Sequence, residues 1–164
     1  LASEVNVGSN GLLVYPFGNG SERMFNNKDI GTCFKNLNLN IHSKQHLYRA
    51  SLEGIAFSFI YGMEILINDN FVPKLVRAGN DNLFQSELFS NTISTVLGQE
   101  IEIYDSTGAY GAARAAGYDS NNFKSYSDKT TRNDYIKSFE PQNHKSSYID
   151  AYNLWKENLL KILN

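Results

Sequence analysis

Residues 74–89 read KLVRAGNDNLFQSELF, and within this stretch the sequence pattern changes from strand-like to turn-like and then to helix-like. Lys74 to Arg77 is typical of a short β-strand, and the residues that follow, Ala78 to Asn82, are small or carry short polar side chains. The last part has apolar residues at helical spacing. A strand, a slender turn and a helix in this order place the turn at the carboxyl end of the strand, where α/β proteins bind ligands.

The same order repeats downstream. Residues 100–104 alternate polar with apolar residues and predict another strand, after a helix that Gly98 is well placed to end. The stretch STGAYGAARAAG, residues 106–117, predicts a helix that is rich in glycine and alanine and capped by Ser106 or Thr107. We therefore expect one α/β layer structure whose central strands contain Leu75, Val76, Ile101 and Ile103.

The flanking segments complete one domain. Apolar runs predict short strands at residues 12–15 and 31–37, and helical spacing predicts a helix over residues 43–68 that is capped by Ser43 and buried on two sides. Apolar residues at three- and four-residue steps predict an amphipathic helix at the end of the chain. We assign residues 1–118 to the domain core, 119–146 to a polar surface connection and 147–164 to the terminal helix of the same domain.

Composition argues against several classes of protein. The 164 residues suit a single domain, and a net charge of -2 without a basic stripe argues against a nucleic-acid partner. Cys33 is the only cysteine, so the chain has no disulfide framework and a reducing, cytoplasmic location is expected. No segment is expected to reach the length of a bilayer span, so no membrane partner is predicted, and the start at Leu1 indicates a processed protein or a part of a longer one.

Local chemistry leaves the role of the first turn open. Ala78 and Gly79 would let a flat ligand approach the backbone, and helix N-terminal N–H groups would face the same opening. Asn80 and Asn82 could contact a base or a ribose, but such residues also form ordinary strand-to-helix turns. The glycine- and alanine-rich helix after the second turn is better explained by close packing than by a ligand.

Five other polar side chains are given no catalytic or metal-binding role. Glu22 and Arg23 suit an ion pair between loop segments better than a place facing a cleft. Glu53 must find hydrogen-bond donors inside an otherwise apolar helix, which favours a structural role, such as capping a neighbouring backbone segment, over that of a base. His42 and His46 are expected on the surface, because no acid or cysteine joins them at the spacing of metal ligands.

Three segments, in this order, resemble the C-terminal half of the FGGY carbohydrate kinases, and xylulokinases most closely. They are GLLVYPFGNGSERMFNNKDIGTCFKNLNL, HLYRASLEGIAFSFIYGMEIL and KLVRAGNDNLFQSELFSNTISTVLGQEIEIYDSTGAYGAARAAG. The resemblance covers about residues 8–117, and the tail with SFEP and the Tyr/Trp helix is similar to the xylulokinase end. It implies an α/β fold that is part of the C-terminal domain of an actin-like, ribonuclease H-like ATPase, with residues 1–118 on the nucleotide side.

In that family ATP and a sugar meet between two halves of the protein, so the resemblance implies ATP and Mg²⁺ as cofactors. Ala78 and Gly79 match the Gly-Gly element beneath adenosine, and Asn80 or Asn82 takes the place of a polar nucleotide contact. Two departures are present. AGND replaces the usual Gly-Gly-Gly-Ala run, and Asn36 stands where the family usually has glycine.

The resemblance also implies which parts of the kinase machinery lie elsewhere. The family's catalytic Asp, its sugar-binding residues and its Gly-Thr-Ser-Gly phosphate loop match no segment here, so no catalytic or metal-binding residue is assigned and the sugar is held mainly by the missing N-terminal half. The parent would transfer the γ-phosphate of ATP to the 5-hydroxyl of D-xylulose or a related ketose and release ADP, whereas the isolated chain is expected to be inactive. A non-catalytic actin-like nucleotide-binding or assembly module, a plain structural α/β domain, and self-association as a homodimer stay open.

Overall fold

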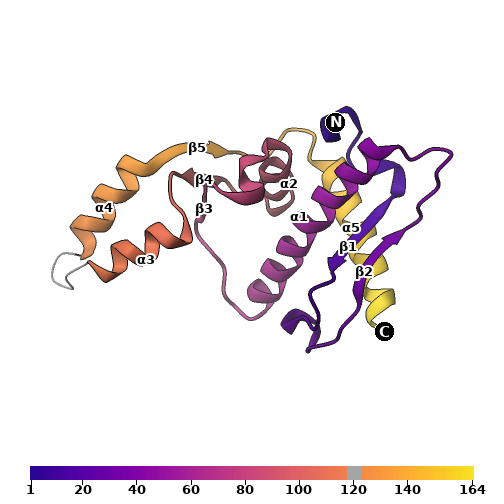
Figure 1. The fold of residues 1–164 in the computed structure, drawn as a ribbon, viewed down its shortest axis with the longest axis horizontal. Coiled ribbons are helices and arrows are strands. Elements are labelled where there is room, and N and C mark those ends of the chain that lie inside the picture. The colour runs from indigo at the N-terminus through magenta and orange to yellow at the C-terminus, as the bar shows by residue number, and fades with distance from the viewer. Residues whose placement is uncertain (118–122) are drawn as a thin grey trace.

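The computed structural model describes residues 1–117 and 123–164. Figure 1 shows an elongated molecule with a β-hairpin and the terminal helix at one end and two helices that extend from a small sheet at the other. The strands are β1 Leu13–Phe17, β2 Gly31–Lys35, β3 Val76–Gly79, β4 Ile101–Tyr104 and β5 Tyr135–Phe139. The α-helices are α1 Lys44–Asn68, α2 Glu87–Leu97, α3 Gly108–Ala116, α4 Phe123–Asp134 and α5 Lys145–Leu163, and short 3-10 turns cover Ala2–Glu4, Ser9–Gly11, Arg23–Phe25 and Asn82–Gln85.

The described strands form two sheets. β1 and β2 pair antiparallel, while the second sheet has the order β3-β4-β5, with β3 parallel and β5 antiparallel to β4. The strand expected at residues 74–77 instead runs from Val76 to Gly79, because this is the part that pairs with Ile101 to Tyr104. Leu75 precedes the strand and is 45% exposed, so its expected place in a central strand is wrong, whereas Ile101 and Ile103 are fully buried.

The segment expected as a polar surface connection contains regular structure. Helix α4 and strand β5 occupy residues 123–139, and β5 joins the sheet beside β4. Phe139 at the end of β5 belongs to the main hydrophobic core. A short strand with so few aliphatic residues gives little periodic signal, and pairing with β4 decides its structure. The expected boundary between residues 118 and 119 lies outside the described residues.

Helix α1 begins and ends where its sequence predicts. Ser43 is its N-cap, with the Ser43 backbone N–H donating to Nδ1 of His46 at 3.2 Å, and Asp69 follows its last residue. The helix has 25 residues and is long and apolar enough to cross a membrane by length and composition, so the expectation that no segment reaches that length is wrong. In this fold α1 packs on β1, α2 and α5. Its second side is only partly covered, because Phe59 and Leu66 remain 52% and 43% exposed.

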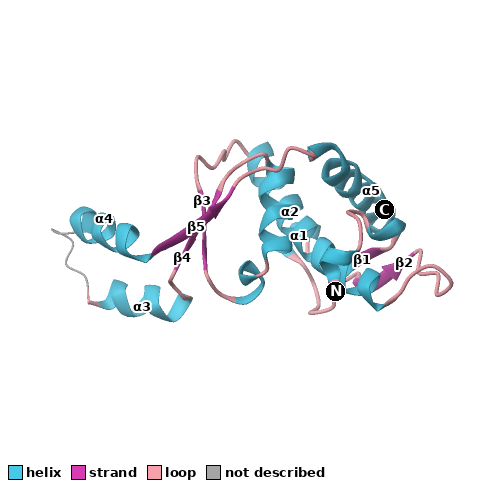
Figure 2. Ribbon diagram, turned by 90° about the horizontal axis from the view of Figure 1, so that it is seen from above, coloured by secondary structure: helices cyan, strands magenta, loops and turns pink. Residues whose placement is uncertain are grey.

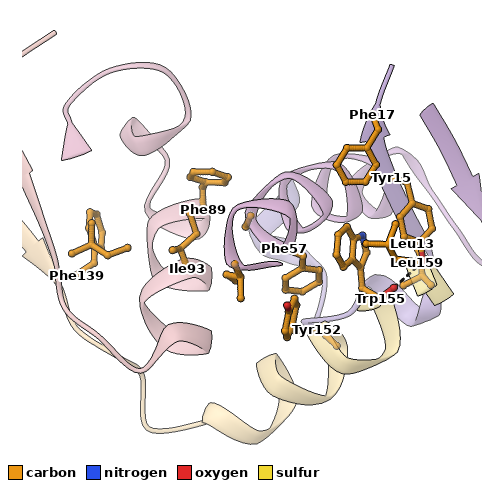
Figure 3. Packing of buried hydrophobic residues seen from close by; sticks show 14 of the residues in the cluster. Leu13, Tyr15, Phe17, Phe57, Phe89, Ile93, Phe139, Tyr152, Trp155 and Leu159 are labelled. Carbon is orange, nitrogen blue, oxygen red and sulfur yellow. Dashed lines mark hydrogen bonds between the residues drawn. The ribbon is translucent and has the colours of Figure 1, made fainter. Parts of the chain in front are cut away.

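The centre of the core joins β1, α1 and α5, as Figure 3 shows. The indole N–H of Trp155 donates to the carbonyl oxygen of Val14 at 2.8 Å, and its ring stacks on Tyr15 with centroids 5.3 Å apart. The same carbonyl lies against α1 at Gly54, where a Cβ atom would come within 2.2 Å of the oxygen. Three elements therefore meet at one backbone group, and glycine is required for α1 to approach so closely.

Candidate functional site

Strands β3 and β4 end side by side, with Gly79 paired to Tyr104. Figure 2 shows their sheet between α2 on one side and the α3 and α4 pair on the other. Gly79 lies directly against the next turn, because a Cβ atom built on it would be 2.2 Å from the carbonyl oxygen of Ser106. Ala78 and Gly79 were expected in a turn but are the last two residues of strand β3. The close approach of Ser106 by itself requires glycine at position 79.

Hydrogen bonds hold the turn after β3. The backbone N–H of Asn80 donates to the carbonyl of Tyr104 at 2.7 Å, and the backbone N–H of Asn82 donates to the carboxylate of Asp81 at 2.7 Å. Asn82 has a φ of 49°, in the left-handed region that asparagine tolerates. The Gln85 side chain donates to the carbonyl of Asn80 at 3.2 Å. These contacts give the turn a defined shape without a ligand.

A cavity of about 390 Å³ opens beside this turn. Its volume lies in the range of small-molecule sites, roughly 300–1,000 Å³. The lining residues come from α1, the end of β3 and the turn after it, α2, the turn after β4 and the start of α3: Phe59, Gly79, Asp81, Asn82, Leu83, Phe84, Phe89, Ser106, Thr107 and Gly108. Two of the predicted site residues, Gly79 and Asn82, line this cavity, whereas Asn80 does not and Ala78 lines a neighbouring one.

Three phenylalanines form an aromatic wall of the cavity, and the sequence patterns did not assign them to it. Phe59, Phe84 and Phe89 contact one another edge to face, with ring centroids 5.3 to 6.2 Å apart. Phe59 belongs to α1, which ends before β3 begins, so only the folded chain brings it to the turn. For Phe84 and Phe89 the available signal was their position just after the predicted turn.

Ser106, Thr107 and Gly108 give the cavity a polar end. Thr107 caps α3 as predicted, since its hydroxyl accepts from the backbone N–H of Tyr110 at 3.3 Å. Helix α3 starts at the cavity with Gly108 in the lining, and helix N-termini favour anions. Within residues 1–117 and 123–164, no group of three His, Cys, Asp or Glu side chains could hold a metal ion.

The small residues of α3 do not serve close packing in the described chain. The helix contains no buried residue, and Cβ atoms built at Gly108 and Gly111 would meet no atom within 4 Å. The expectation that this glycine- and alanine-rich surface packs tightly on the sheet is therefore wrong for these residues. The helix instead extends away from the sheet, as Figure 1 shows.

A second cavity, of about 270 Å³, shares Gly79 with the first. In its lining, Arg77 Nε donates to the Glu102 carboxylate at 2.9 Å, and the Tyr104 hydroxyl donates to the same group at 2.5 Å. The hydrogen bonds from Tyr104 and Arg77 hold the pKa of Glu102 below its usual value. Arg114, also in the lining, is paired with a carboxylate of α4. Both guanidinium groups are thus neutralised within the chain, which makes this cavity a poor site for phosphate.

Glu53 has the structural role expected of it. Its side chain is 3% exposed and accepts hydrogen bonds from Arg49 Nε at 2.6 Å, the Gly8 backbone N–H at 3.0 Å and the Ser9 hydroxyl at 3.1 Å. Burial raises the pKa of Glu53, and the charge of Arg49 and the hydrogen bonds oppose that rise. The carboxylate therefore ties α1 to the N-terminal segment.

His42 and the loop charges differ from expectation. His42, expected on the surface, is 6% exposed, and its Nδ1 accepts from the backbone N–H of Asn38 at 3.0 Å within the loop before α1. His46 belongs to the cap of that helix. Glu22 forms a backbone bridge with Lys28, and among the described residues no ion pair joins it to Arg23.

Sequence relatives of the chain are sugar kinases, although no model of a known family matches it. The chain is 27% identical over 107 residues to the gluconokinase of Bacillus subtilis, which covers 65% of this chain and 20% of that protein. It is 24% identical over 163 residues to the xylulose kinase of Staphylococcus xylosus, which covers 94% of this chain and 32% of that protein. The chain thus spans a fifth to a third of the length of these relatives.

Solved structures show the same fold. The crystal structure of xylulose kinase from Rhodospirillum rubrum matches with a TM-score of 0.77 at 23% identity, over 98% of this chain and 32% of that one. The crystal structure of Plasmodium falciparum glycerol kinase with ADP matches with a TM-score of 0.71 at 17% identity, over 95% of this chain and 31% of that one. The resemblance to FGGY-type sugar kinases is confirmed, and the fold is part of their actin-like ATPase fold.

Proposed function

We propose that the chain is the C-terminal, nucleotide-binding part of a sugar kinase, and that the cavity beside Gly79 receives the nucleoside of ATP and ADP. The position of this cavity carries the proposal. It lies at the carboxyl ends of the parallel strands β3 and β4, where open α/β sheets bind ligands, and Gly79 and Asn82 line it. The likeness to a glycerol kinase solved with ADP supports a nucleotide as the ligand.

The chemistry of the lining suits the parts of a nucleotide. The aromatic wall offers apolar surface to a flat base, while the Asn82 amide and the Ser106 and Thr107 hydroxyls offer hydrogen bonds to a base or ribose. The start of α3 offers backbone N–H groups on the side where phosphates would continue. Ala78 and Asn80 support the site from outside the cavity, through strand pairing and the hydrogen bond to Tyr104.

The reaction we propose for the full-length protein is transfer of the γ-phosphoryl group of ATP to the 5-hydroxyl of D-xylulose, giving ADP and D-xylulose 5-phosphate. The hydroxyl proton must pass to a base, and we place that base and the sugar pocket in the remainder of the parent, so this chain holds and orients the nucleotide. Mg²⁺ would neutralise charge on the phosphates, and we assign it no ligand in this chain. We place D-xylulose first because the sequence relative that aligns with 94% of the chain is a xylulose kinase, whereas the gluconokinase aligns with 65% of it.

The test is a phosphorylation assay of the full-length protein with ATP and a panel of D-xylulose, other ketoses, gluconate and glycerol. We expect the highest kcat/KM for D-xylulose and no turnover by the 164-residue chain alone. Turnover by the isolated chain would show that the base lies within it. A full-length protein that binds ATP but phosphorylates none of the panel would instead be a non-catalytic actin-like binding or assembly module.

A further inference from the structure

Phe59 is an aromatic side chain left open in the wall of the nucleotide cavity. Its ring is 52% exposed, although it lies among two other phenylalanines. Phe84 and Phe89 approach it at interplanar angles of 75° and 86°, with centroids 6.2 and 6.1 Å away. These are the perpendicular contacts that aromatic pairs favour, so two neighbouring rings hold the plane of Phe59 in place.

The exposure distinguishes Phe59 from its neighbours. Phe89 is 1% exposed and serves the core, whereas half of the Phe59 surface is free for another group. A rigid aromatic ring that is oriented by its neighbours loses little conformational freedom when a ligand covers it. The cavity that it lines also contains amide and hydroxyl groups, which is the composition expected around a base and its ribose.

We propose that Phe59 is the residue on which the base of the nucleotide stacks. The inference rests on the proposed function, because it requires a nucleotide in this cavity. Stacking is tolerant of base identity, since every base has a π-face. Phe59 therefore contributes affinity for nucleotides in general, and Asn82, whose amide both donates and accepts, distinguishes one base from another.

The variants Phe59→Leu and Phe59→Tyr in the full-length parent test this role. Tyr48→Leu is a matched control, because Tyr48 lies on the same helix, is 54% exposed and does not line the cavity. Affinities for ADP and GDP are measured by isothermal titration calorimetry. We expect Phe59→Leu to weaken both nucleotides by the same factor, about five- to thirtyfold, whereas Phe59→Tyr and Tyr48→Leu bind as the wild type does.

The outcomes separate the stacking role from the nucleotide site itself. If the wild type binds ADP and Phe59→Leu binds it equally well, Phe59 does not stack the base, and the proposed function still stands. If the wild type binds neither nucleotide, the proposed function fails. Should Phe59→Leu not fold, the nuclear Overhauser effect between the Phe59 ring protons and the base protons of bound ADP decides. Its presence supports stacking, and its absence while ADP is bound overturns it.

Discussion

The two ends of the molecule bury their side chains to different degrees. At the hairpin end, β1, α1 and α5 enclose Tyr15, Phe57 and Trp155, each at most 2% exposed (Figure 3). At the other end, α3 has no buried residue, Tyr110 is 60% exposed, and a cavity opens beside Gly79. Burial stabilises the first end, whereas the second keeps surface available for a ligand. Substitutions at the hairpin end should therefore act on stability, and those at the cavity end on nucleotide binding.

The largest effect is expected from Trp155→Ala at the hairpin end. The substitution removes a buried ring and the hydrogen bond to the Val14 carbonyl, so the free energy of unfolding should fall by about 3–5 kcal/mol. Urea denaturation measures the change. Trp155→Phe keeps an aromatic ring but leaves that carbonyl without its donor, and should cost less, about 1–3 kcal/mol. A Trp155→Ala variant as stable as the wild type would refute the division between a packed end and an open end.

At the cavity end, Asn82→Gly should weaken ADP binding with little loss of stability. Glycine readily adopts the φ of 49° at this position, so the change removes the amide without straining the turn. Loss of one ligand hydrogen bond should weaken binding by about 1–2 kcal/mol, roughly five- to thirtyfold. Calorimetric titration measures the ADP affinity, and a thermal melt measures the stability. Asn80→Ala is the control, because Asn80 does not line the cavity and should leave ADP affinity unchanged.

Gly79→Val is a less informative change than its place in the cavity implies. Gly79 is not among the residues with positive φ, so backbone strain is not the reason for glycine here. A side chain would instead collide with the Ser106 carbonyl oxygen, which lies 2.2 Å from the ideal Cβ position. The variant would therefore disturb the fold and the ligand site together.

Much of the fold follows from local pattern, and the exceptions have a common cause. The cap of α1 at Ser43, the end of α2 at Gly98 with a φ of 67°, and the alternation in β4 all depend on neighbours in sequence and were predicted correctly. The register of β3, the addition of β5 and the burial of His42 depend on segments distant in sequence, so local pattern could not give them.

The site was predictable to the same extent. Gly79 and Asn82 are predicted site residues that line the cavity, but the sequence does not show which side chains between Ala78 and Asn82 face it, so Ala78 and Asn80 are predicted together with them. Phe59 could not be predicted as a residue of the cavity, because its spacing in the sequence shows only that it lies on an apolar face of a helix. Its place in the cavity comes from the packing of α1 beside α2.

Asn36 offers a smaller test at the hairpin end. It has a φ of 64°, which explains why asparagine can stand where the FGGY kinases usually have glycine. Its side-chain amide also donates to the carbonyl of Gly11 at 3.1 Å. Both Asn36→Gly and Asn36→Ala lose this hydrogen bond, but glycine adopts the positive φ without strain, so Asn36→Ala should be the less stable of the two by about 1 kcal/mol. Equal stability of both variants in chemical denaturation would show that backbone conformation does not select this residue.

The smallest effect is a pH dependence beside the second cavity. Hydrogen bonds from Tyr104 and Arg77 lower the folded-state pKa of Glu102 below its ordinary value of 4.5, so the ionised form is the one that stabilises the fold. That contribution to stability is present at pH values above the unfolded-state pKa of Glu102, and it is lost as the pH falls through the folded-state pKa. The stability difference between the wild type and Glu102→Gln should therefore shrink when the pH drops from about 6 to 3. A difference that grows on acidification would show that the pKa is raised.

Hydrogen–deuterium exchange of the full-length protein with and without ADP tests the central claim most directly, because it reports on both ends at once. The nucleotide site beside Gly79 predicts that ADP slows exchange in peptides covering residues 79–85 and 106–111 and leaves residues 13–17 and 31–35 unchanged. Binding of ADP without protection of the first two peptides, or with protection confined to β1 and β2, would contradict the placement of the nucleotide in this cavity.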